Sequence, residues 1–92
     1  MSEFDTVNLW LEDLRGTLDL AGLGEIDVPQ LLATVREIAH TVIHPAGPIA
    51  LLAIGYAAGQ AGGGAAAVGQ LETQVLELAR TFAARHPAVR DA

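Results

Sequence analysis

The chain has 92 residues, enough for one domain with a single core and too few for a large cleft between two lobes. It has no cysteine, which excludes disulfides, thiolate metal sites and cysteine nucleophiles. The net charge is −6, and residues 1–27 hold seven acidic residues with Arg15 as their one basic residue. Because phosphate contacts need a basic face, this charge argues against a nucleic-acid partner. The acidic first third suits a solvated surface or, alternatively, a basic protein surface.

The stretch from Pro45 to Leu71 has no charged residue, which raises the question of a membrane span. A span needs about 20 strongly apolar residues in a row. Here the strongly apolar run covers only Ile49 to Ala58, and three glycines interrupt the stretch at positions 62–64. Glu3 and Asp5 also stand where a secretory signal would be basic. We therefore expect a cytoplasmic protein without a membrane span.

The first helix is predicted at about residues 5–20, where apolar residues recur at helical spacing. Its predicted stripe consists of Val7, Leu11, Leu14 and Leu18. Trp10 widens this stripe, and we expect it to anchor the core; stacking on a ligand is the alternative.

Two further helices meet at a proline-rich elbow. The second is predicted at residues 28–44, with Asp27 as its cap, and it must end before Pro45, which disfavours helical geometry in the preceding residue. The third is predicted at residues 48–60, after the elbow Pro45-Ala46-Gly47-Pro48. It is apolar nearly all round, which is typical of the central, most buried helix of a small bundle.

The last helix is predicted at residues 65–85, ending before the His86-Pro87 pair. Its apolar stripe consists of Val68, Leu71, Val75, Leu78 and Phe82. No segment alternates with the period of a strand. The predicted fold is all-α: one domain over residues 1–92, a compact four-helix bundle with a central apolar helix.

Two histidines near the elbow are the first candidates for a site. Glu37, His40 and His44 share one helix face at i, i+3 and i+7, and histidines four residues apart can bind one metal ion. A carboxylate-bridged metal pair would need further acidic residues on the other buried faces, where few are present. We assign no metal ligand: His40 is expected to hydrogen-bond a neighbouring oxygen, and His44 to lie at the helix C-terminus, which favours a cation.

Glycines recur every four residues at Gly55, Gly59 and Gly63. Such a ridge lets another helix approach closely. We expect that helix to belong to the same chain; a second subunit, and hence a homodimer, is the alternative. Tyr56 lies among small residues and needs a hydrogen-bond partner if it is buried. The sequence has no phosphate-binding loop and no nucleophile paired with a base, so we assign no catalytic residue and no cofactor.

The segment from Val35 to Gly59 resembles a small actinobacterial domain of unknown function. The matching motifs are Ala39-His40, the elbow Pro45–Pro48 and Gly55-Tyr56-Ala57-Ala58-Gly59, and the helix around Trp10 is also similar. Members of that family occur alone or appended to nucleotidyltransferase-like domains that resemble molybdenum-cofactor guanylyltransferases. The family usually has arginine where this chain has His44, which weakens an anion-binding role at that position.

Three hypotheses follow, and a binding function is favoured over an enzyme. The first is a non-enzymatic interaction module beside a nucleotidyltransferase of molybdenum-cofactor synthesis, as the resemblance implies. The second is a small-ligand or metal-binding protein. Its candidate site is the corner formed by His40, His44, Pro45, Gly47, Pro48 and Tyr56. The third is an accessory that completes a partner's active site.

Overall fold

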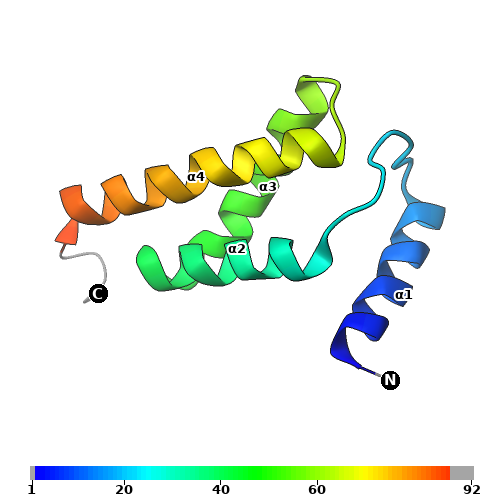
Figure 1. The fold of residues 1–92 in the computed structure, drawn as a ribbon, viewed down its shortest axis with the longest axis horizontal. Helices are drawn as coiled ribbons and strands as arrows, with labels where there is room; N and C mark the ends of the chain where they lie inside the picture. The colour runs from blue at the N-terminus through cyan, green and yellow to red at the C-terminus, as the bar shows by residue number, and fades with distance from the viewer. Residues whose placement is uncertain (1, 88–92) are drawn as a thin grey trace.

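The computed structural model describes residues 2–87, and this part of the chain consists of four helices without a strand (Figure 1). The helices are α1 (Glu3–Thr17), α2 (Val28–Thr41), α3 (Ala46–Gln60) and α4 (Ala65–Arg85). The predicted all-α, four-helix class is therefore confirmed. The bounds predicted for the last helix agree with α4.

α1 begins two residues earlier than predicted because Ser2 and Asp5 cap its start. The Asp5 amide donates to Ser2 Oγ at 3.0 Å, and the Ser2 amide donates to Asp5 Oδ2 at 3.1 Å. This reciprocal pair satisfies two amides that have no partner inside the helix. The helix ends at Thr17, since Leu18 has an extended backbone.

The α2–α3 corner also differs from the prediction at both helix ends. α2 ends at Thr41, three residues before the predicted end, and α3 begins at Ala46, two residues before the predicted start. Pro45 itself has a helix-like backbone and directly precedes α3. Pro48 then falls in the first turn of α3, where amide hydrogens need no partner within the helix. The predicted elbow is thus the first turn of α3.

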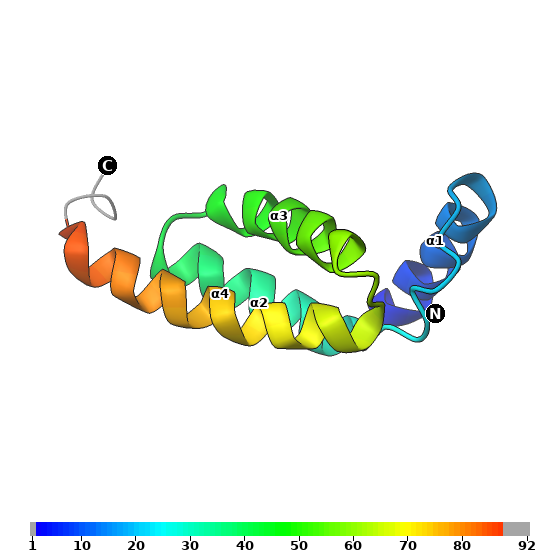
Figure 2. The ribbon, with the colours of Figure 1, turned by 90° about the horizontal axis from the view of Figure 1, so that it is seen from above.

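The packed part of the protein has two layers. α2 and α4 lie side by side and run in the same direction, and α3 crosses them in a second layer (Figures 1 and 2). The buried apolar side chains are Val28 and Ile38 of α2, Ile54 and Ala58 of α3, and Ala79 of α4. α3 is therefore the shared packing partner of α2 and α4. Its burial is one-sided, however, because no other helix within residues 2–87 covers its outer face.

α1 stands at one end of the molecule (Figure 2) and contributes no buried residue. It packs mainly against α2, and the radius of gyration is 14.4 Å. A compact domain of this length would have about 12 Å. The expectation that Trp10 anchors the core is wrong: its side chain is 62% exposed, because the first helix meets too little of the other three.

Hydrogen bonds join the linker between α1 and α2 to two helices, α1 and α4. Arg15 Nη2 donates to the Gly24 carbonyl at 2.5 Å, and the Ala65 amide donates to the Leu23 carbonyl at 2.8 Å. The first bond returns to α1, and the second joins the linker to the start of α4. The linker therefore has a defined place beside α4.

Candidate functional site

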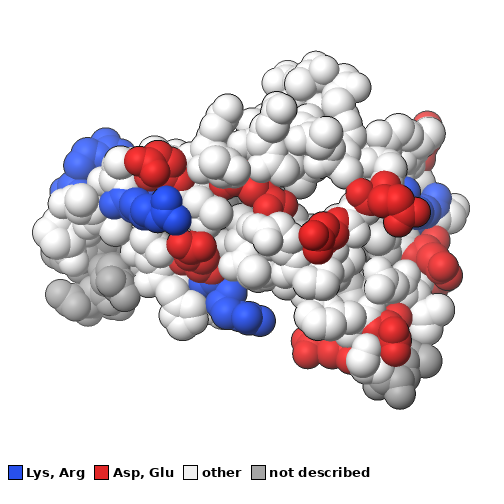
Figure 3. Space-filling model, viewed as in Figure 1, with Lys and Arg blue, Asp and Glu red and all other residues white. Residues whose placement is uncertain are grey.

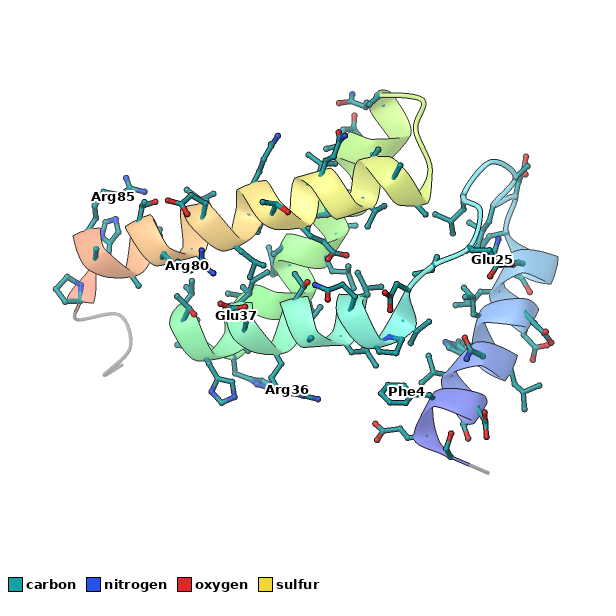
Figure 4. The ribbon with its side chains drawn as sticks, viewed as in Figure 1. Phe4, Glu25, Arg36, Glu37, Arg80 and Arg85 are labelled. Carbon is teal, nitrogen blue, oxygen red and sulfur yellow. The ribbon has the colours of Figure 1, made fainter. Side chains whose placement is uncertain are left out.

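The two candidate histidines lie at the α2–α3 corner. His40 is in the last turn of α2, His44 is in the turn that follows, and both are exposed. Neither side chain forms a hydrogen bond within residues 2–87. Glu37, their neighbour on α2, forms an ion pair with Arg80 of α4 instead, at 3.2 Å (Figure 4). The described residues hold no group of three or more side chains placed to bind a metal ion.

Gly47 has a clear packing role at the same corner. It is buried, and a Cβ atom at this position would lie 2.9 Å from Val35 Cγ1 and 3.0 Å from the Val35 carbonyl oxygen. These distances are shorter than an ordinary van der Waals contact. Gly47 therefore lets the first turn of α3 rest directly on the backbone of α2. Pro45 and Pro48, on either side of it, are exposed.

Tyr56 lies away from the corner, on the outer face of α3. It follows Ala46 by ten residues, which corresponds to about 15 Å along the helix axis. Its side chain is exposed, and Gln60 Nε2 donates to its hydroxyl at 3.1 Å. Tyr56 belongs instead with two other exposed apolar residues of α3, Ile49 and Leu52. We call these three residues the α3 outer face.

The three ridge glycines differ from one another in their surroundings. A Cβ atom at Gly55 or Gly59 would meet no atom within 4 Å. No other helix of the described chain therefore packs closely on these two glycines. At Gly63, in the turn before α4, a Cβ atom would lie 2.6 Å from the Cβ of Ala67, so this glycine has a local role.

A hollow of about 470 Å³ lies beside α3, at a place that the sequence did not single out. It is enclosed by the linker and by α2, α3 and the first half of α4, and it opens on the face seen in Figure 3. Most of its lining is apolar, including Leu23, Leu31, Leu51, Ile54 and Val68. We call it the Glu72 hollow, after the acid in its wall. Its size is typical of a small-molecule site.

Glu72 is one of two buried polar residues among those described, with 6% of its surface exposed. The other is Thr34, whose hydroxyl lies 2.8 Å from Glu72 Oε2 and 3.1 Å from the Gln30 carbonyl oxygen. The shorter distance marks the Glu72 carboxylate as the preferred acceptor. This bond joins α2 to α4. A signal was present in the sequence: Glu72 lies between Val68 and Val75, at i+4 and i−3, on the apolar stripe of its helix.

A second, wholly apolar groove of about 340 Å³ lies on the other flank of α3. Its walls come from all three packed helices and include Ile38, Val42, Ile49, Val75, Leu78 and Phe82. Ile49 borders this groove and also belongs to the α3 outer face. The apolar surface therefore continues from the outer face of α3 into the groove beside α4.

The fold and these surfaces define a small all-α domain whose central helix is flanked by an acid-bearing hollow and an apolar groove. The chain belongs to the family described as Domain of unknown function (DUF6457), whose model matches residues 2–90. No curated protein and no solved structure matches the chain. Within residues 2–87, none of the helices combines the length and the hydropathy needed to cross a bilayer.

Proposed function

We propose that this chain is a protein-interaction module that presents the α3 outer face to an apolar groove of a partner protein. The observation that carries this proposal is the exposure of three large side chains on one helix: Ile49 is 67% exposed, Leu52 73% and Tyr56 69%. They recur at i, i+3 and i+7, which is the anchor pattern of a helix bound in a groove. Exposed apolar surface of this kind marks interaction sites in soluble proteins.

The distribution of charge supports the same surface. No charged residue occurs between Pro45 and Leu71, so α3 and the turn after it carry none. In Figure 3 the acidic surface gathers at the α1 end, most of the arginine surface lies toward the opposite end, and the region of α3 is uncharged. Docking through this region therefore removes no charged side chain of this chain from water. The free-energy cost of desolvating a charge, which is large, is avoided.

The extent of the surface favours a groove of another protein over a second copy of this chain. Stable flat interfaces use roughly 20–30 residues on each side, and the α3 outer face with its adjoining groove is smaller. A groove that encloses α3 from both flanks covers more of each side chain than a second flat face would. A homodimer through the same residues is the competing arrangement.

The resemblance to domains appended to molybdenum-cofactor guanylyltransferase-like proteins supplies the partner. We take a cytoplasmic nucleotidyltransferase of that class, in an actinobacterial setting, as the protein that carries the groove. In this role the domain would act beside the enzyme and would bring no catalytic residue of its own. This assignment depends on the resemblance, whereas the choice of surface depends on the exposed residues of α3.

A binding experiment with one substitution tests the proposal. Leu52→Asp places a charge in the middle of the α3 outer face. Gln70→Asp is the control, because it places the same charge at an exposed position of another helix, α4. We expect the purified nucleotidyltransferase to bind the natural chain in titration calorimetry. Leu52→Asp should weaken that affinity by about 30-fold or more, the effect of losing an interface hot spot. Gln70→Asp should bind as the natural chain does.

Sedimentation of the chain alone completes the test, and we expect a monomer. Absence of binding by the folded natural chain, or equal binding by Leu52→Asp, would contradict the proposal. A dimer that Leu52→Asp dissociates would also overturn it, because the α3 outer face would then be an interface between copies.

A further inference from the structure

The Glu72 hollow contains two glycines that packing does not explain. Gly55 in α3 and Gly69 in α4 both line it, and a Cβ atom at either position would meet no atom within 4 Å. A glycine inside a helix costs about 1 kcal/mol relative to alanine. Where a glycine allows two helices to pack closely, the packing offsets this cost. No helix packs closely on Gly55 or Gly69, since the space beside each of them is open. A side chain at either position would extend into open space at the border of the hollow.

The Glu72 carboxylate has one donor among the described residues. Oε2 accepts the hydrogen bond from Thr34, and no hydrogen bond to Oε1 occurs within residues 2–87. The described residues have no fully enclosed side-chain oxygen or nitrogen without a hydrogen-bond partner. Oε1, which has no partner, is therefore accessible. Because Glu72 lines the hollow, Oε1 is accessible from there. The carboxylate therefore offers an acceptor to whatever fills the hollow.

No arginine within residues 2–87 supplies a counter-charge to Glu72. Arg80 pairs with Glu37 and Glu77, and these are the ion pairs of the described residues. The two other acceptors in the wall are the side chains of Gln30 and Asp27, and no basic side chain lines the hollow. A buried carboxylate without a cationic partner is costly. The hollow thus combines apolar walls, oxygen acceptors and excess negative charge.

We propose that the Glu72 hollow binds a small molecule that has an ammonium head and an apolar body. The ammonium group donates to Glu72 Oε1, and the side chains of Asp27 and Gln30 bring further oxygens to the same hollow. The apolar body lies between Leu31, Leu51 and Val68. An ammonium group fits better than a metal ion, because the described residues hold no cluster of three metal-ligating side chains. This site does not depend on the α3 outer face or on its partner.

Three probes of equal chain length test the head group: n-octylammonium, n-octanol and n-octanoate. Each is titrated into the full-length protein below its aggregation concentration, and binding is followed by calorimetry and by protein NMR shifts. We expect octylammonium to bind at least tenfold more tightly than octanol, since a hydrogen bond to a charged group is stronger than a neutral one. Octanoate should not bind. Failure of octylammonium to bind at millimolar concentration, or octanoate binding as tightly, would overturn the proposal.

Glu72→Gln separates charge from shape. Glutamine has nearly the same size and keeps an acceptor for the Thr34 hydroxyl, so the fold should be retained. The tenfold preference for octylammonium over octanol should disappear in this variant. A retained preference would show that another group binds the cation, which contradicts the assignment to Glu72.

Gly69→Leu tests the place of binding by filling the hollow with a side chain. Gly16→Leu is its matched control, because Gly16 is also a helical glycine with nothing within 4 Å of a built Cβ and lies in α1, away from the hollow. We expect Gly69→Leu to abolish binding of octylammonium and Gly16→Leu to leave it unchanged. Equal binding by a folded Gly69→Leu protein would exclude the hollow as the site. If Gly69→Leu does not fold, the Glu72→Gln comparison decides the question.

Discussion

Gly47→Ala is the substitution for which the structure makes the sharpest prediction. The added methyl group would lie 2.9 Å from Val35 Cγ1 and 3.0 Å from the Val35 carbonyl oxygen. Cγ1 belongs to a side chain, which can shift only slightly. The carbonyl oxygen belongs to the backbone of α2, which moves away only if α2 and α3 separate. Overpacking of this kind costs typically about 1–3 kcal/mol.

The intrinsic preference of helices for alanine opposes this cost. Alanine is favoured over glycine by about 1 kcal/mol inside a helix, and Gly47 lies in the first turn, where we expect less of that gain. We therefore expect a net loss of about 1–2 kcal/mol in the free energy of unfolding. In a domain of this size each kcal/mol lowers Tm by roughly 4–8 °C. Urea denaturation followed by far-UV circular dichroism measures the effect.

Gly55→Ala is the matched control, because it makes the same change in a helix where a Cβ atom meets nothing within 4 Å. It should raise the free energy of unfolding by up to about 1 kcal/mol. Val35→Ala, combined with Gly47→Ala, removes the Cγ1 contact and should recover part of the loss, but not the part due to the carbonyl oxygen. If Gly47→Ala is as stable as the natural chain, or if Gly55→Ala is the more destabilising change, the reasoning is wrong.

Three further predictions concern the linker, the buried hydrogen bond and α1. Gly64→Ala would drive its Cβ atom into the carbonyl oxygens of Gly22 and Leu23, so it should cost about 1–3 kcal/mol and speed hydrogen exchange of the Ala65 amide; an unchanged exchange rate would contradict the placement of the linker. Thr34→Val should lower the free energy of unfolding by about 1–3 kcal/mol because it leaves the buried Glu72 carboxylate without its donor, whereas Thr34→Ser, which keeps the hydroxyl, should lose less; equal losses in urea titrations would refute this. Trp10 fluorescence should be quenched by acrylamide nearly as strongly in the native as in the unfolded protein, and Trp10→Ala should change stability by less than about 0.5 kcal/mol; a well-shielded tryptophan would mean that α1 packs more closely in solution.

Local signals were enough to place the helices. Asp27 marks the start of α2, and Pro45 separates α2 from α3. The apolar stripe that begins at Val68, together with the His86-Pro87 pair, predicts α4 with its observed bounds. These signals act within a few residues through caps, backbone restriction and helical periodicity. The errors at helix ends are local as well: the capping box of Ser2 and Asp5 starts α1 two residues before the predicted start, and α2 ends at Thr41, earlier than Pro45 alone requires.

The candidate site was less predictable. The histidine corner was chosen because its residue types are unusual, yet His40 and His44 are exposed and the hollow lies elsewhere along α3. Glu72 was not singled out because an acidic residue on an apolar stripe is normally expected at the solvent-exposed border of that stripe. Only the positions of the neighbouring helices show that it is buried. Its burial depends on Thr34 of α2, a residue 38 positions away.

The sequence alone determined that the described chain forms four helices, where their caps and prolines lie, and that α3 carries no charge, because these properties depend on neighbours along the chain. Only the tertiary structure decided which face of each helix is covered. The apolar stripe of α1 and the outer face of α3 both look like core in the sequence, but within residues 2–87 the stripe is only half-buried and the outer face of α3 is exposed. It also decided that Gly47 touches backbone whereas Gly55 and Gly69 border open space, because a glycine's role depends on what stands opposite its missing side chain.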